Sequence, residues 1–191
     1  MDLQKIGFEL FLDPLTAPGE ASAFMPVFQA WLQKKALAGL WIDAADYGHV
    51  PEGPGVVLVG HEANLSYDRE EGRPGILLVR KTPMEGSSAA RLCAVMKAAL
   101  GAAVLLEKDP SFVPGLRFLP GRCGFLVNDR LAAPNSDQTL AALRPELEIF
   151  FSRLFGGPEI QFRRSGGLKR RFEVQITAPS REPPAGLLAR L

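Results

Sequence analysis

The amino-acid sequence predicts an α+β fold, in which three helices pack against a mostly antiparallel sheet. Short apolar or alternating runs bounded by glycine and proline recur along the chain, as is typical of strands joined by turns. Three longer segments instead carry apolar residues at a spacing of three to four, which indicates helices. The expected order is β-α-β-β-β-α-β-β-β-α-β-β, and this grouping of strands favours an antiparallel sheet over parallel βαβ units.

The length of the chain predicts one domain. At 191 residues, of which 47% are hydrophobic, the chain can build one sizeable core. We therefore expect a single α+β domain over residues 1–177. Residues 178–191 are rich in proline and short of core residues, so we expect them to form a flexible tail.

The first two elements are a strand and a helix. Residues 5–12 place alternate apolar side chains on one face of an extended chain, which predicts a strand that becomes buried. A helix follows over residues 24–38 and stops at Gly39. Its apolar residues at helical spacing are Phe28, Trp31, Leu32 and Ala36.

Three strands are expected next, and they hold most of the polar residues suited to chemistry. A short strand at 41–46 and a long strand at 56–68 flank a VPEGPG turn. In the long strand His61 falls on the apolar face, so we expect its imidazole to be buried and hydrogen-bonded. The apolar run at 76–81 pairs with the long strand as a hairpin.

The middle of the chain predicts a second helix and a buried strand. The helix begins at Ser87 or Ser88 as N-cap and ends near Gly101. The apolar run at 103–108 then predicts a strand.

The last third predicts two short strands, a helix and a hairpin. The strands lie at 116–119 and 124–130, and Asn135 or Ser136 caps the helix. Pro145 removes a hydrogen bond inside that helix and should kink or split it. The final hairpin turns at a Ser-Gly-Gly sequence, with aromatic and β-branched residues facing each other across its two strands.

Charge and cysteine usage narrow the class of protein. The net charge of +1 disfavours a dedicated nucleic-acid or membrane-surface protein, although residues 1–96 are acidic and residues 97–191 are basic. Cys93 and Cys123 form no CxxC pair, which favours reduced thiols. No basic leader and no window approaching about 18 apolar residues is apparent, so we expect a soluble cytoplasmic protein that does not enter a membrane.

A histidine and carboxylate cluster is the first candidate site. Asp46, His49, His61 and Glu62 flank the VPEGPG turn, which could bring the two imidazoles together. These four would supply general acid and base groups, and Asp46, His49 and His61 would bind a divalent metal such as Zn²⁺, Mn²⁺ or Fe²⁺. The alternative is a core histidine, a loop histidine and turn carboxylates, because no HExxH motif is present.

The loop before the second helix is a candidate site for an anionic cofactor. Arg80 and Lys81 end a strand, and the amides of Gly86, Ser87 and Ser88 open the helix, where a phosphate or pyrophosphate could bind. The element order resembles the N-acetyltransferase fold, in which such a helix start binds the pyrophosphate of coenzyme A. The loop lacks that family's glycine-rich run, and the sequence identifies no cofactor.

The basic terminal hairpin is the candidate for partner binding. Its cations are Arg163, Arg164, Lys169, Arg170 and Arg171. They would meet an acidic protein partner or a phosphate backbone, or serve only to protect a sheet edge. Because Phe162 and Phe172 fall on the core face, no aromatic side chain is placed to stack on bases, and we expect no appreciable binding to generic nucleic acid at physiological salt.

Three functions remain open from the sequence. The first is an oligomeric or partner-binding module without catalysis, formed with further copies of the chain or with an acidic protein. The second is a small-molecule enzyme that uses the His49 and His61 cluster, with or without a metal. The third is a weak nucleic-acid binder.

Overall fold

The structure is a computed structural model that describes residues 2–50, 53–68, 72–167 and 169–191. The strands are β1 (Ile6–Leu12), β2 (Trp41–Asp46), β3 (Val56–Gly60), β4 (Ala63–Asp68), β5 (Gly75–Arg80), β6 (Phe118–Val127), β7 (Gln161–Arg164) and β8 (Phe172–Thr177). The helices are α1 (Phe24–Lys34), α2 (Ser88–Glu107), α3 (Asp137–Phe155) and α4 (Pro184–Leu188), with one 3-10 turn at Ala21–Ala23.

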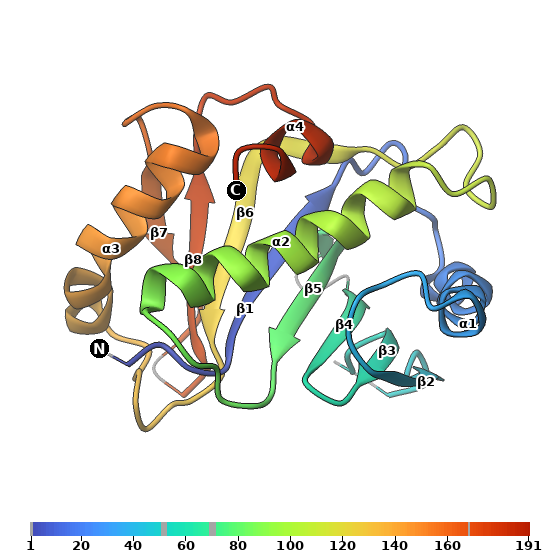
Figure 1. Cartoon of the computed structure of the whole chain (residues 1–191), viewed down its shortest axis with the longest axis horizontal. Coiled ribbons are helices and arrows are strands. Elements are labelled where there is room, and N and C mark those ends of the chain that lie inside the picture. The colour runs from blue at the N-terminus through green and yellow to red at the C-terminus, as the bar shows by residue number, and fades with distance from the viewer. Residues whose placement is uncertain (1, 51–52, 69–71, 168) are drawn as a thin grey trace.

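Within the described residues the strands form one eight-stranded sheet in the order β2-β3-β4-β5-β1-β6-β8-β7. Each neighbouring pair is antiparallel. This confirms the predicted α+β class and its antiparallel sheet. Figure 1 shows the helices on one side of the sheet, with α2 crossing in front of β5, β1 and β6.

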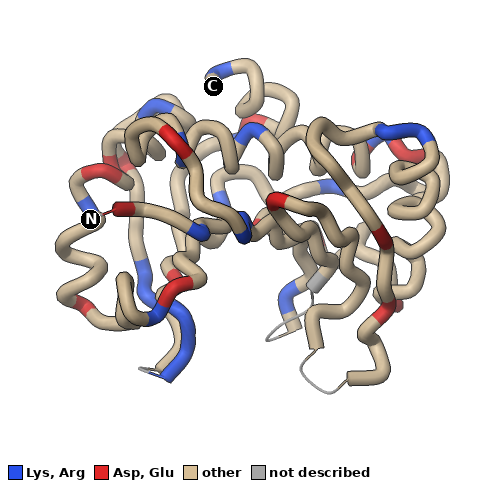
Figure 2. The backbone as a smooth tube through the Cα atoms, turned by 60° about the horizontal axis from the view of Figure 1, so that its bottom comes forward, with Lys and Arg blue, Asp and Glu red and all other residues tan. Residues whose placement is uncertain are grey.

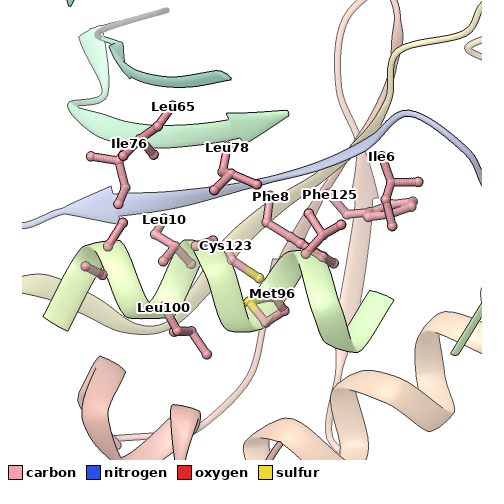
Figure 3. Close-up of a cluster of buried hydrophobic side chains, with 14 of the residues drawn as sticks. Ile6, Phe8, Leu10, Leu65, Ile76, Leu78, Met96, Leu100, Cys123 and Phe125 are labelled. Atoms are coloured by element: carbon pink, nitrogen blue, oxygen red, sulfur yellow. The ribbon is translucent and has the colours of Figure 1, made fainter. Parts of the chain in front are cut away.

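The core lies between α2 and this covered face of the sheet. Phe8 and Leu10 of β1 point toward Met96 and Leu100 of α2, with Cys123 of β6 beside them (Figure 3). All five side chains are nearly or fully buried. Burying a large apolar side chain contributes about 1.5–3 kcal/mol, so this layer accounts for much of the stability.

Aromatic contacts attach the outer helices to the sheet. Phe8 lies 6.0 Å from Phe150 and 6.1 Å from Phe151 of α3, measured between ring centroids. At the other end, Phe24 of α1 stacks on Tyr67 of β4 at 4.1 Å. Such pairs add about 0.5–1.5 kcal/mol beyond burial, and they fix where α1 and α3 lie on the sheet.

Helix α2 is long and apolar enough, by length and composition, to cross a membrane, and it alone meets that test in the described part of the chain. The expectation that no segment approaches such a length was therefore wrong. The helix lies along the sheet, and eight of its residues are buried there. A core helix of this kind satisfies the same test of composition as a membrane span.

The segment predicted as one strand over residues 56–68 is two strands joined by a tight turn. β3 and β4 pair with each other, with Leu58 opposite Leu65. His61 and Glu62 form the turn between them and are exposed, so the prediction of a buried His61 was wrong. The sequence concealed this turn because the alternating apolar pattern continues through it, and Gly60 is the one residue there that signals a bend.

Other boundaries differ from prediction because packing overrode local patterns. Residues 103–107 continue α2 and do not form a strand, since their apolar side chains extend its buried side. The two strands expected at 116–130 are one, β6. The structure gives α3 as one helix with Pro145 inside, and Ser136 accepts a hydrogen bond from the Thr139 amide as predicted for an N-cap.

Some predicted features fall on residues that the structure leaves undescribed. Residues 51–52 of the VPEGPG turn lie outside the described residues. The same holds for residues 69–71, in the turn that precedes β5.

Residues 178–191 were expected to be a flexible tail, and the structure instead places α4 there. Leu187 is 7% exposed and belongs to the main core cluster. The Arg190 guanidinium donates to the Leu154 carbonyl at 3.2 Å and pairs with Glu182 at 3.0 Å. The prolines that suggested a flexible tail include one at the first turn of α4, a position where proline is favourable in a helix.

Leu187→Ala tests whether α4 contributes to the core. We expect the free energy of unfolding to fall by about 2 kcal/mol or more, because removing buried methyl groups loses transfer energy and leaves a cavity. Urea unfolding would measure the change, and Leu131→Ala, at a side chain that is 96% exposed, is the control. A loss at Leu187 as small as at Leu131 would show that the segment behaves as a tail.

Cys123 gives the stability a defined pH dependence. Burial, with a smaller contribution from the charge of Glu9, raises the pKa of the Cys123 thiol well above its usual range. In the unfolded chain a thiol titrates near about 8.5, so above that pH the unfolded state loses a proton that the folded state keeps. The contribution of the Cys123 thiol to the free energy of unfolding is therefore fully present below the pKa of the unfolded state, and it falls as the pH rises above that value.

We expect the free energy of unfolding to decrease above pH 9 by up to about 1.4 kcal/mol per pH unit from this group. Cys123→Ala should unfold more easily at pH 7, yet lose less stability between pH 8 and pH 10. Urea unfolding of both proteins across that range measures the two slopes. Equal slopes would contradict a protonated, buried thiol.

Candidate functional site

The structure does not bring the predicted histidine cluster together. His49 lies in the loop before β3 and His61 in the turn after it, so the five residues of β3 separate them by roughly 16 Å. Asp46 accepts a hydrogen bond from the Gly48 amide at 2.7 Å, and Glu62 pairs with Arg80 at 2.6 Å. No group of three or more potential metal ligands occurs within the described ranges.

The predicted anion site at the start of α2 is only partly assembled. Ser87 uses its hydroxyl to accept from the Ala90 amide at 3.3 Å, as an N-cap does. Arg80 points to Glu62 in the β3–β4 turn and away from the helix start. A helix start without a converging cation gives no specific cradle for a phosphate.

The basic hairpin divides into three sets of side chains. Arg164 faces the helices, where its guanidinium pairs with Asp137 at 2.8 Å and thus holds the hairpin against the start of α3. Arg163 and Lys169 are exposed. Arg170 and Arg171 instead line a polar pocket on the other face of the sheet.

That other face is the one not covered by the described helices. Gly7, Glu9 and Phe11 of β1 point to it, because Ile6, Phe8 and Leu10 point to the core. Figure 2 shows the chain as an arch, with lysines and arginines gathered along the leg that carries the β7–β8 turn.

We call this feature the Glu9 pocket; its lining residues are Glu9, Arg73, Ser165, Gly166, Arg170, Arg171 and Glu173. Glu9 comes from the central strand, Arg73 from the segment before β5, and the others from the β7–β8 hairpin. Glu9 is 8% exposed, which is unusual for a carboxylate. The pocket is therefore lined by three guanidinium groups and two carboxylates, which come from three distant parts of the sequence.

Two glycines make room for the Glu9 carboxylate. A Cβ atom placed on Gly124 would lie 3.2 Å from Glu9 Oε2, and one placed on Gly75 would lie 3.3 Å from Oε1. Both contacts are tighter than ordinary van der Waals separations. The Glu9 carboxylate thus lies beside the backbone at both glycines, where a side chain at either position would crowd it.

The arginine from the β4–β5 side is oriented by an aromatic ring. The Arg73 guanidinium carbon lies 5.1 Å from the centroid of Phe11, within the range of a cation–π contact. On the hairpin side, Arg171 and Glu173 approach each other at 3.7 Å. On each side of the pocket, a contact with a neighbouring side chain therefore positions one of the lining arginines.

The turn that forms the far wall is held from behind. Asn135 is 1% exposed, and its Nδ2 donates to the carbonyls of Ser165 at 2.8 Å and Gly167 at 3.2 Å. Arg164 donates to the Gly166 carbonyl at 3.3 Å, and Arg130 donates to the Lys169 carbonyl at 2.9 Å. These hydrogen bonds pre-organise the turn before any ligand arrives.

Sequence reasoning identified Arg170 and Arg171 but missed Glu9, Arg73 and Glu173. A signal for Glu9 was present, since it is the one charged residue in the run Ile6–Leu12 and falls on the face opposite to the core pattern. Arg73 carried no such signal. Its place depends on the register of β5 against β1, which a single sequence does not encode locally.

Comparison with known proteins assigns the chain to no family. No protein-family model matches the chain, and a search of curated proteins gave no match. The resemblance to the N-acetyltransferase fold therefore has no support from sequence comparison, and the inference about function depends on the geometry.

Asn135→Ala tests the scaffold of the turn. Removing its amide takes a donor from the Ser165 and Gly167 carbonyls, of which Gly167 still accepts from the Arg170 amide at 3.0 Å. We therefore expect the free energy of unfolding to fall by about 1–3 kcal/mol. Hydrogen exchange at the amides of Gly166 and Arg170 should accelerate more than exchange in β1. Asn128→Ala, at an exposed asparagine, is the matched control, and equal effects of the two variants would contradict the scaffold.

Proposed function

We propose that this protein is a non-catalytic binding module that recognises an acidic segment of a partner protein at the Glu9 pocket and its basic rim. The observation that carries the proposal is the pre-organised turn, which presents cations beside a buried polar pocket on the uncovered sheet face. Arg163 and Lys169, which are exposed in the same hairpin and do not line the pocket, form the exposed basic rim, and an acidic partner is the complementary chemistry.

The sheet face is a better docking surface than either sheet edge. On β2 the register shifts between Trp41 and Asp43, and the Asp43 carboxylate accepts from the Ala44 amide at 2.8 Å. A bulge and a carboxylate on an edge strand oppose addition of a further strand. At the opposite edge, the four-residue β7 carries two arginines, which protect it in the same way.

A protein partner fits this surface better than a nucleic acid. The pocket places Glu9 and Glu173 among its arginines, and a phosphate backbone would meet both carboxylates. Phe162 lies on the side of α3, 6.2 Å from Phe151, and so cannot stack on bases at the rim. A segment with separated carboxylates can instead pair with the exposed Arg163 and Lys169 one by one.

The test uses synthetic 15-residue peptides of alternating glutamate and leucine blocks, with glutamine and lysine versions as controls. Fluorescence anisotropy should show binding of the glutamate peptide that weakens between 50 and 300 mM salt, because the contacts are ionic. Replacing Arg163 and Lys169 by serine should reduce affinity at least about tenfold. The glutamine and lysine peptides should bind the natural protein more weakly than the glutamate peptide does.

Matched control variants and a nucleic-acid probe decide between explanations. Arg153→Ser with Arg181→Ser removes two exposed arginines outside the pocket and should leave affinity unchanged. Equal losses in both sets would indicate general charge attraction and contradict the proposal. Tighter binding of an unselected DNA single strand or duplex than of the glutamate peptide would also overturn it.

A further inference from the structure

We infer that two loops, residues 13–19 and 109–115, dock on a lipid membrane surface by inserting their exposed aliphatic side chains. This inference is independent of the proposed binding of an acidic segment, because neither loop lines the Glu9 pocket. It departs from the expectation of no membrane contact. That expectation was drawn from net charge and from long apolar segments, and it did not consider single side chains at loop tips.

The two loops share a sequence pattern and a turn. Residues 13–19 read DPLTAPG and residues 109–115 read DPSFVPG, so both follow the pattern D-P-x-x-x-P-G. In each loop the aspartate carboxylate accepts a hydrogen bond from the amide two residues later, from Leu15 at 3.0 Å and from Ser111 at 2.9 Å. Each aspartate carbonyl also accepts from the amide three residues later. The shared pattern therefore forms the same tight turn twice.

Hydrogen bonds join the two loops to the same part of the fold. The Asp13 amide donates to the Arg117 carbonyl at 2.8 Å, and the Arg117 amide donates to the Thr16 hydroxyl at 3.0 Å. Phe112 of the second loop turns inward, where its ring lies 5.0 Å from that of Phe24 in α1. Segments that are distant in the sequence are therefore anchored next to each other.

The outer parts of both loops are apolar and exposed. Leu15 is 91% exposed and Val113 is 90% exposed. The rings of Pro14, Pro110 and Pro114 are exposed beside them in the chain. Burial of apolar area is favourable roughly in proportion to the area removed from water, so these side chains keep almost all of that gain for a partner.

The backbone of these loops is suited to leaving water. Prolines occupy three of the ten positions in residues 13–18 and 109–112, and a proline has no N–H group. Each remaining amide in these two stretches donates a hydrogen bond within the chain. An amide without a partner is costly where water is scarce, as it is in a lipid bilayer. A loop that stays in water does not need such bonds, because water pairs with its amides.

A lipid surface fits these loops better than a protein partner does. The loops present five exposed apolar side chains, whereas a stable protein interface uses roughly 20–30 residues on each side. A lipid surface needs no complementary shape, since binding scales with the apolar area inserted. Lys108 and Arg117 are exposed and flank the second loop, so their flexible side chains can reach head-group phosphates. The exposed Glu20 opposes them, and insertion therefore supplies most of the binding.

The test measures binding of the full chain to vesicles of phosphatidylcholine, alone or mixed with phosphatidylserine, by co-sedimentation. We expect the natural protein to bind both kinds of vesicle. Leu15→Ser with Val113→Ser should lower the partition coefficient at least about tenfold, because two apolar side chains no longer enter the lipid. Leu131→Ser with Ile149→Ser is the matched control, at side chains outside the loops that are 96% and 76% exposed, and it should bind like the natural protein.

Leu15→Trp gives a readout that loss of folding cannot imitate. Tryptophan favours the interface between lipid and water, so this variant should bind vesicles several-fold more tightly than the natural protein. Its fluorescence should also shift to shorter wavelength when vesicles are added, beyond any shift of the natural protein. Leu131→Trp, outside the loops, is the control and should show neither change.

Three results would overturn the inference. Failure of the natural protein to bind either kind of vesicle would leave the loops for a protein partner and refute the membrane surface. Equal losses in the loop variant and its matched control would indicate general adsorption. Binding that requires phosphatidylserine and is unchanged in the loop variant would indicate charge attraction without insertion.

Discussion

The rest of the structure depends on the requirement that both faces of β1 be removed from water. All seven residues of this central strand are buried, although the described helices cover one face only. On the covered face, α2 supplies the contacts. On the other face, burial comes from the curvature of the sheet and from side chains that reach in from both flanks, such as Arg73 over Phe11. The central strand therefore links the β4–β5 side of the molecule to the terminal hairpin.

A buried carboxylate in that strand needs a reason. Taking a charge out of water costs several kcal/mol, and a well-packed apolar group at the same place is often as stable or more so. Position 9 could therefore hold a valine or leucine if Gly75 and Gly124 were also changed. The glycines and the arginines instead accommodate a charge, which favours a role in recognition over a role in stability alone.

The sequence predicted those elements whose patterns are local. The fold class, the Ser87 and Ser136 caps and the facing strands of the terminal hairpin follow from spacing and turn chemistry. His61 was misplaced because the alternation of β3 and β4 continues through a two-residue turn. The strand expected at 103–108 failed because an apolar run alone does not distinguish a strand from the end of a buried helix. The Glu9 pocket could not be predicted, since it joins residues from β1, the segment before β5 and the hairpin by long-range register.

The terminal hairpin is held in place by contacts from behind, which suits the role in recognition that we propose better than a role in solubility alone. Behind it, Asn135 and Arg164 fasten the turn to the start of α3. In front, Arg170 and Arg171 share the pocket with Glu9. Charges that only keep a sheet edge soluble act from mobile side chains and gain nothing from a fixed backbone. A turn held in one shape loses less entropy when it binds, so its rigidity is the property expected of a surface selected to recognise a ligand.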